Sequence, residues 1–139
     1  DRDGNPLAAI HIVPAISPVY LNNPAVEVGW YDKSNGELKD YAPQYLDLSS
    51  AKPTWATEYV FTQAYGLPRP NLAALEELGR EIHEGNSTSG VGEKYSKFYG
   101  AGVSIFLTPN NWLDYSCAQT EITASRFSQC TRAGASQRP

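Results

Sequence analysis

The sequence contains no methionine, only two cysteines and two histidines, and no surplus of positive charge. Because even position 1 lacks Met, we expect the amino terminus to arise by cleavage or to lie within a longer protein. A formal net charge of −4 offers no basic field for a phosphate backbone and argues against nucleic-acid binding. No apolar run approaches the about 20 residues that a transmembrane helix needs. The first four residues, Asp1 to Gly4, do not form a secretory signal.

The scarcity of histidine limits the chemistry that the chain can perform. A dinuclear metal site needs several His, Asp and Asn ligands that converge from loops. Here His11 lies in a predicted strand and His83 near a predicted helix end, and HExxH, paired CxxC and GxGxxG patterns are absent. A packed sheet histidine and a helix-end histidine are the simpler interpretations. The residues therefore predict no catalytic or metal-ligating group in this chain.

Cys117 and Cys130 leave two alternatives open. In one unbroken helix they would lie about 20 Å apart at ~1.5 Å per residue, whereas a disulfide needs Cα atoms within ~7 Å. Either the helix breaks between them or both are free thiols. Asn86-Ser87-Thr88 is an N-glycosylation sequon in a secreted eukaryotic protein, or else simply a polar loop after a helix.

Strand patterns occupy the first third of the sequence. The apolar run from Leu7 to Val13, closed by Pro14, predicts a buried strand. Alternation from Ala25 to Tyr31 predicts a second strand, and the turn that ends in Asn35-Gly36 predicts a hairpin return over residues 37 to 48. Pro43 in the returning strand indicates an edge position or an early end.

Helical patterns follow Pro53. We expect one helix from Trp55 to the Gly66-Leu67-Pro68 stop, and a second that begins at Asn71 as N-cap and closes at Gly85. A short helix is predicted from Glu93 to Tyr99, and a last one, with a break inside it, from Trp112 to Phe127. Strands followed by helices indicate an α+β fold. We divide the chain into closing strands (1–50), a helical region (51–132) and a frayed tail (133–139).

An ordered set of short motifs resembles the acid sphingomyelinase-like phosphodiesterases of the calcineurin-like metallophosphoesterase superfamily. The resemblance spans roughly residues 4 to 100. Its motifs are Asn23-Pro24, Tyr31-Asp32, the run from Gly36 to Tyr41, Trp55 with Glu58-Tyr59, and the run from Tyr65 to Pro68.

The resemblance implies that this chain provides the late strands of a calcineurin-like layered sandwich and a helical carboxy-terminal cap. It implies two divalent metal ions, commonly zinc, whose ligands lie upstream of Asp1 in motifs such as Gly-His-x-His. It also implies that Tyr20, Asn22 and Asn23 form one wall of the substrate pocket. Asn22 and Asn23 have an alternative interpretation, because asparagines before Pro24 also cap turns.

Two functions of different classes follow. The first is the carboxy-terminal part of a phosphodiesterase that cleaves phosphodiester or phosphoanhydride bonds, inactive alone and partnered by the missing amino-terminal catalytic portion. The expected compartment is secreted, periplasmic or lysosome-like. The second is a stand-alone binding module on the same scaffold, without catalysis.

Overall fold

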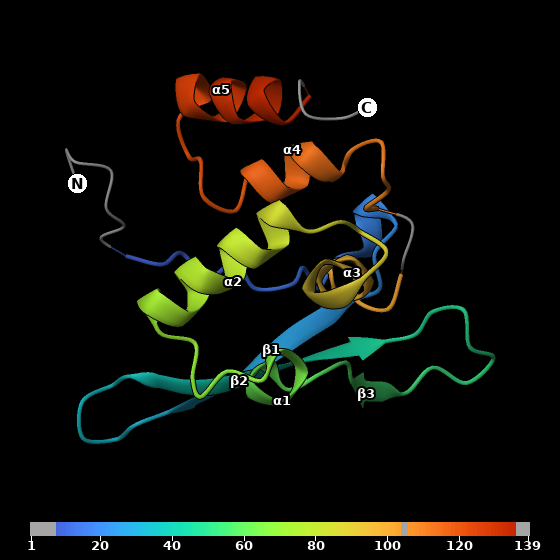
Figure 1. The fold of residues 1–139 in the computed structure, drawn as a ribbon. Coiled ribbons are helices and arrows are strands. Elements are labelled where there is room, and N and C mark those ends of the chain that lie inside the picture. The colour runs from blue at the N-terminus through green and yellow to red at the C-terminus, as the bar shows by residue number, and fades with distance from the viewer. Residues whose placement is uncertain (1–7, 104–105, 136–139) are drawn as a thin grey trace.

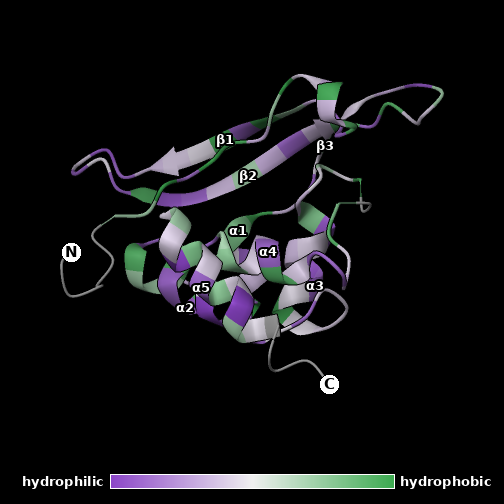
Figure 2. Ribbon diagram, turned by 90° about the horizontal axis from the view of Figure 1, so that it is seen from above, coloured by the Kyte–Doolittle hydropathy of each residue, from purple (hydrophilic) through white to green (hydrophobic). Residues whose placement is uncertain are grey.

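The computed structural model describes residues 8–103 and 106–135, in which a three-stranded antiparallel sheet is followed by five α-helices. The sheet lies on one side of the helices (Figures 1 and 2). After the 3-10 turn η1 (Pro18–Tyr20), the strands are β1 (Ala25–Tyr31), β2 (Leu38–Leu46) and β3 (Trp55–Thr57). The helices are α1 (Phe61–Tyr65), α2 (Leu72–Glu84), α3 (Gly90–Phe98), α4 (Trp112–Cys117) and α5 (Ala124–Ala135). The predicted α+β order is confirmed, and no helix in the described ranges is long and apolar enough to cross a membrane.

The predicted hairpin is confirmed. β1 pairs with β2 from Ala25↔Tyr45 to Tyr31↔Leu38. The turn closes where the Gly36 amide donates to the Asp32 carbonyl over 2.8 Å, with Gly36 at φ +73°, a backbone conformation that favours glycine.

Of the two alternatives indicated by Pro43, the edge position is wrong, because β2 is the central strand in the order β1-β2-β3. The strand does end earlier than predicted, at Leu46 rather than at residue 48. The Leu46 amide bonds to the Pro24 carbonyl, so Pro43, opposite Glu27, directs its backbone N and O away from β1. On that side its carbonyl accepts from the Glu58 amide at 2.9 Å, beyond the end of the β3 pairing. Proline therefore costs the β1–β2 ladder no hydrogen bond.

The strand predicted from Leu7 to Val13 is wrong for residues 8–13, which form no regular secondary structure; Leu7 lies outside the described residues. Ile10 and Ile12 are 78% and 85% exposed instead of buried. The physical reason is the lack of a neighbour, since none of the described strands pairs with this segment. A strand without a partner leaves its backbone groups to water.

The helix expected from Trp55 begins only at Phe61, because Trp55 to Thr57 form β3 against the end of β2. This short segment pairs with Gln44 to Leu46 on the side of β2 that faces away from β1. The periodicity of so short a segment cannot distinguish a helix from a strand. The stop at Gly66 is confirmed by its left-handed backbone, at φ +70°.

The later helices follow the sequence more closely. The Asn71 side chain caps α2 by accepting from the Ala74 amide at 2.9 Å, and Gly85 ends the helix as predicted. The short helix begins earlier than expected, at Gly90 rather than Glu93. The break predicted in the last helix falls between Cys117 and Ala124. Residues 133–135, expected to fray, belong to α5, and 136–139 lie outside the described residues.

The core lies between the sheet and the helices and is rich in aromatic rings. The Tyr41 ring from β2 stacks on the Phe61 ring from α1 with centroids 4.9 Å apart. Phe61 is fully buried and Trp112, at the start of α4, is 4% exposed. The core residues are Tyr41, Phe61, Leu78, Ile82, Leu107 and Trp112.

Glu58, between β3 and α1, binds the chain that follows α3. Its Oε1 accepts from the Gly102 amide at 2.6 Å. Burial raises the pKa of the carboxyl from 4.5 to about 7, although the Gly102 hydrogen bond and the charge of Lys97 act in the opposite direction. A pKa raised by folding contributes stability that is complete below pH 4.5 and is lost as the pH rises to about 7.

We therefore expect Glu58→Gln to flatten the pH dependence of stability. The amide keeps an acceptor for Gly102 and carries no charge to bury. Between pH 5 and pH 8 the wild type should lose about 1 to 2 kcal/mol more unfolding free energy than the variant, with allowance for screening by water. Denaturant unfolding of both proteins at the two pH values measures this difference. Equal losses in the two proteins would show that Glu58 is ionised at no cost in the fold.

Candidate functional site

The loop that carries Tyr20, Asn22 and Asn23 is a tight, proline-bounded turn. Pro18 begins η1, where its fixed φ suits the first turn and its missing N–H costs no bond. The turn closes through the Leu21 amide, which donates to the Pro18 carbonyl at 3.0 Å with Leu21 at φ +68°. The loop then enters β1 through Asn23-Pro24.

The Asn23 side chain is buried and joins distant parts of the chain. Its amide nitrogen donates to the Ala101 carbonyl at 2.9 Å, and its oxygen accepts from the Leu48 amide at 3.1 Å. Only 7% of the residue is exposed. Both ends of the amide are therefore satisfied inside the fold, where each hydrogen bond contributes about 1 kcal/mol.

Asn22 stabilises the loop itself. Its amide nitrogen lies 3.2 Å from the Ser17 carbonyl and 2.9 Å from the Asn23 carbonyl. These local contacts favour the turn-capping interpretation for Asn22, whereas the Asn23 side chain binds residues far away in the sequence and does not cap this turn. Tyr20 is 76% exposed and carries none of these bonds. A place for the three side chains in a pocket wall stays a prediction.

Large apolar side chains remain in water on the loop, on the segment before it and on β1. Figure 2 colours much of residues 8–21 as hydrophobic. Segment and strand border one another in an open groove of about 450 Å³. Its lining residues are Val13, Pro14 and Ile16 from the segment and Ala25, Val26, Glu27, Gly29 and Tyr31 from β1. We call the following residues the exposed apolar set: Ile10, Ile12, Val13, Ile16, Val19, Tyr20, Leu21, Val26, Val28, Trp30 and Tyr31.

β1 is also an edge strand. The Ala25 amide bonds to the Ala15 carbonyl at 3.1 Å, and the described residues place no strand beyond it. The backbone groups of Glu27 and Gly29 point to the same open side, because they alternate with residues that face β2. An apolar edge of this kind is a template for pairing with another strand.

His11 attaches the segment to the sheet. Its Nε2 lies 3.0 Å from Glu27 Oε2, and its ring centroid lies 4.3 Å from that of Tyr41. Burial raises the pKa of Glu27, although the charge of His11 lowers it. The packed-histidine interpretation of His11 agrees with this contact. Sequence reasoning missed Glu27, whose only signal was a carboxylate inside an apolar alternating strand.

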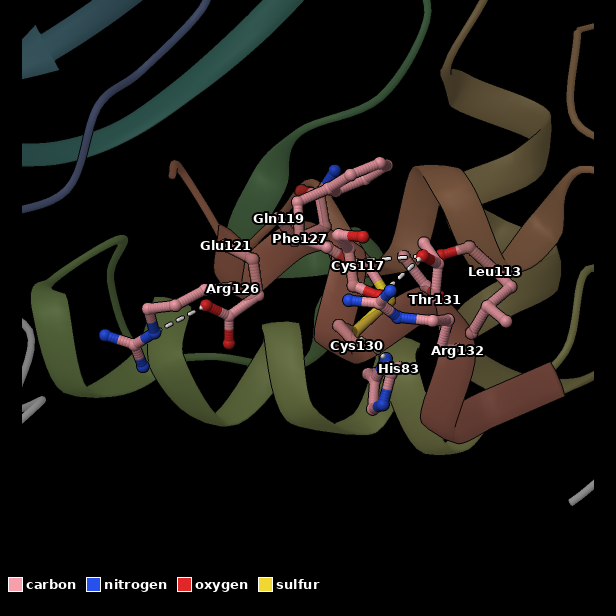
Figure 3. Close-up of a disulfide and its surroundings, with 12 residues drawn as sticks. His83, Leu113, Cys117, Gln119, Glu121, Arg126, Phe127, Cys130, Thr131 and Arg132 are labelled. Atoms are coloured by element: carbon pink, nitrogen blue, oxygen red, sulfur yellow. Dashed lines mark hydrogen bonds and ion pairs between the residues drawn. A yellow bond between two sulfur atoms is a disulfide. The ribbon is translucent and has the colours of Figure 1, made fainter. Parts of the chain in front are cut away.

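The described residues hold one cluster with the donor atoms of a metal site, and its chemistry does not suit a metal ion. His83 Nδ1, Cys117 and Cys130 lie within 4.8 Å of one another, at the α2, α4 and α5 helices (Figure 3). The two sulfurs are joined in a disulfide with Cα atoms 6.0 Å apart, so neither is available as a thiolate ligand. The pair of zinc ions implied by the resemblance therefore does not fit the residues described. The break between α4 and α5, one of the two alternatives, is what brings the cysteines together.

Several tyrosine side chains lie in or against the core, and none of them can act as an acid or base near neutral pH. Burial raises the pKa of Tyr41, Tyr59 and Tyr65, so each stays neutral. Their rings pack against other aromatic rings, either stacked or edge to face, and so stabilise the core. The ring centroids of Tyr59 and Phe98, for example, lie 4.2 Å apart in a stacked pair. The geometry thus presents a surface and a scaffold, with no catalytic constellation in the described residues.

Comparison with known proteins identifies the family of the chain. Residues 5–135 match the family model described as "Acid sphingomyelin phosphodiesterase C-terminal region". Human "Acid sphingomyelinase-like phosphodiesterase 3b" is 28% identical over 94% of this chain and 31% of the relative. Mouse "Cyclic GMP-AMP phosphodiesterase SMPDL3A" is 36% identical over 71% of this chain and 23% of the relative.

A more distant relative agrees. "Sphingomyelin phosphodiesterase B" of Dictyostelium discoideum is 27% identical over 87% of this chain and 20% of the relative. The matches thus span less than a third of the length of each of these relatives. Because the family model matches nearly the whole sequence, the chain belongs to the acid sphingomyelin phosphodiesterase C-terminal region family.

Proposed function

We propose that this chain is the carboxy-terminal part of a metal-dependent phosphodiesterase and that it has no catalytic activity by itself. The observation that carries the proposal is the exposed apolar set beside the open edge of β1. Isolated apolar side chains on a surface need no explanation, but many gathered on one segment, its loop and the adjoining strand indicate an interface. The chain spans 31% and 20% of two of its relatives, and the remaining length of such a protein could provide the neighbour that covers this face.

The occupant of this face is the amino-terminal catalytic portion of the same protein. Its strand would add to β1 at the backbone groups of Glu27 and Gly29, and residues 8–13 would gain the partner that they lack here. These strands would then close a calcineurin-like sandwich. Burying half of the exposed apolar set would contribute roughly 10 kcal/mol, a large fraction of a domain's stability.

The residues that would hold the metal ions belong to that portion, and the ions would there supply an activated water. This chain's own residues provide the scaffold and, with Tyr20 on its exposed loop, one wall of the pocket. Asn22 and Asn23 fix the loop that presents Tyr20. The substrate class is a phosphodiester or phosphoanhydride, and the Cys117–Cys130 disulfide supports a secreted, periplasmic or lysosome-like compartment.

The first expectation concerns activity. The full-length protein should hydrolyse bis-p-nitrophenyl phosphate and lose that activity when a chelator removes its metal ions. On this proposal, the residues that bind those ions are absent from the isolated chain. The purified 139-residue chain should release no p-nitrophenol under the same conditions, with or without added zinc. Chelator-sensitive turnover by the isolated chain would overturn the proposal.

The second expectation concerns the covered face. Ile12→Glu in the full-length protein should lower the unfolding free energy by about 2 to 4 kcal/mol, because it buries a charge against the catalytic portion. Ile122→Glu is a matched control: Ile122 lies between α4 and α5 and is 84% exposed, against 85% for Ile12. The control should change stability by less than about 0.5 kcal/mol. Thermal unfolding and secretion yield measure both variants, and equal tolerance of the two would show that Ile12 stays in water.

A stand-alone binding module is the second candidate. The observation in its favour is the self-contained core around Phe61 and Trp112, with the disulfide beside it. Under this hypothesis the isolated chain is monomeric and unfolds in one cooperative transition without binding a hydrophobic dye. Under the leading proposal the chain binds the dye through its exposed apolar set or aggregates. Gel filtration and dye fluorescence on the same sample separate the two.

A further inference from the structure

The turn between α2 and α3 holds Asn86-Ser87-Thr88 in an ordered conformation. Asn86 Oδ1 accepts from the Thr88 amide at 2.9 Å, from the Thr88 hydroxyl at 2.8 Å and from the Ser89 hydroxyl at 3.1 Å. The third sequon residue, whose hydroxyl the modification requires, therefore binds the amide that would be modified. Asn86 itself is exposed, whereas Ser87 is 9% exposed.

The surrounding structure fixes the turn without using the amide nitrogen of Asn86. The Trp112 indole donates to the Gly85 carbonyl at 3.1 Å, which ties the end of α2 to α4. The Asn86 carbonyl lies so close to Gly92 that a Cβ there would meet it at 2.0 Å, so only glycine fits opposite the turn. Within the described ranges Nδ2 of Asn86 has no hydrogen-bond partner, and it lies on an exposed side chain.

We propose that Asn86 is a site of N-linked glycosylation. The donor is an oligosaccharide held through C1 to a lipid pyrophosphate. The bond from Asn86 Nδ2 to sugar C1 forms and the bond from C1 to the pyrophosphate oxygen breaks. The lipid pyrophosphate leaves with the bonding electron pair, and the one proton that the amide loses passes to it or to water. No oxidant or reductant takes part. The disulfide independently indicates the oxidising compartment in which this transfer occurs.

The fold accommodates the sugar. The three hydrogen bonds to the Asn86 side chain all use Oδ1, which remains an acceptor after the transfer, and the amide nitrogen keeps one proton. The end of α2 lies beside α4, farther from the sheet than the start of the helix does (Figure 1). A glycan here would leave β1 and the exposed apolar set clear.

The test is site-specific mass spectrometry of the full-length protein secreted from eukaryotic cells. Cleavage after Arg80 and Lys94 releases a peptide, residues 81–94, that contains Asn86 and no other sequon. We expect most of this peptide to carry a glycan that peptide-N-glycosidase F removes, leaving an isotope-labelled aspartate when the digestion is done in heavy-oxygen water. An unmodified peptide from folded, secreted protein would overturn the proposal.

Matched variants test whether the modification of Asn86 depends on the sequon. Thr88→Ser keeps a hydroxyl at the third position and should keep the glycan, whereas Thr88→Val should lose it although Asn86 is still present. Asn86→Gln should lose it as well. Modification that persists in Thr88→Val would contradict the assignment, because it would not depend on the sequon.

Discussion

An apolar strand edge has to be paired or covered, and within residues 8–103 and 106–135 no strand pairs with the outer side of β1. The front of the molecule follows from that constraint. Residues 8–13, before η1, form no regular secondary structure, and no described strand pairs with them. The segment before η1 is held to the sheet by the His11 contacts with Glu27 and Tyr41 and by the bond from the Ala25 amide to the Ala15 carbonyl. The Asn22 and Asn23 side chains then fix the loop into β1 with bonds that involve no ligand. On the proposed function, the front of the chain is one half of an interface.

The rear of the chain is built in another way, from contacts that are complete within it. Tyr41 and Phe61 join the sheet to the helices, and Trp112 closes the far end by bonding to the turn after α2. The disulfide links α4 to α5 and, on the loop-closure argument, contributes roughly 3 kcal/mol. A well-packed helical cap and a sheet with an open edge support the proposal that this region completes a larger enzyme.

Local signals in the sequence were reliable where one short motif determines the conformation. Asn35-Gly36 predicted the hairpin, Asn71 the cap of α2, and Gly66 the end of α1. Predictions failed where a distant partner decides. Residues 8–13 have a strand pattern but no neighbour, Trp55 to Thr57 became a strand because β2 offered a free edge, and Pro43 fits a central strand because its nitrogen points past the end of β3. The family could be recognised from ordered motifs, yet the buried carboxylates of Glu27 and Glu58 could not, because burial is a property of the assembled fold.

Amide hydrogen exchange tests the central claim most directly. The outward-facing amides of Glu27 and Gly29 on β1 should exchange within seconds in the isolated chain and be protected in the full-length protein, while the Leu46 amide, already bonded to Pro24, is protected in both. Equally fast exchange of Glu27 and Gly29 in the full-length protein would contradict the account, since it would show that nothing pairs with this edge.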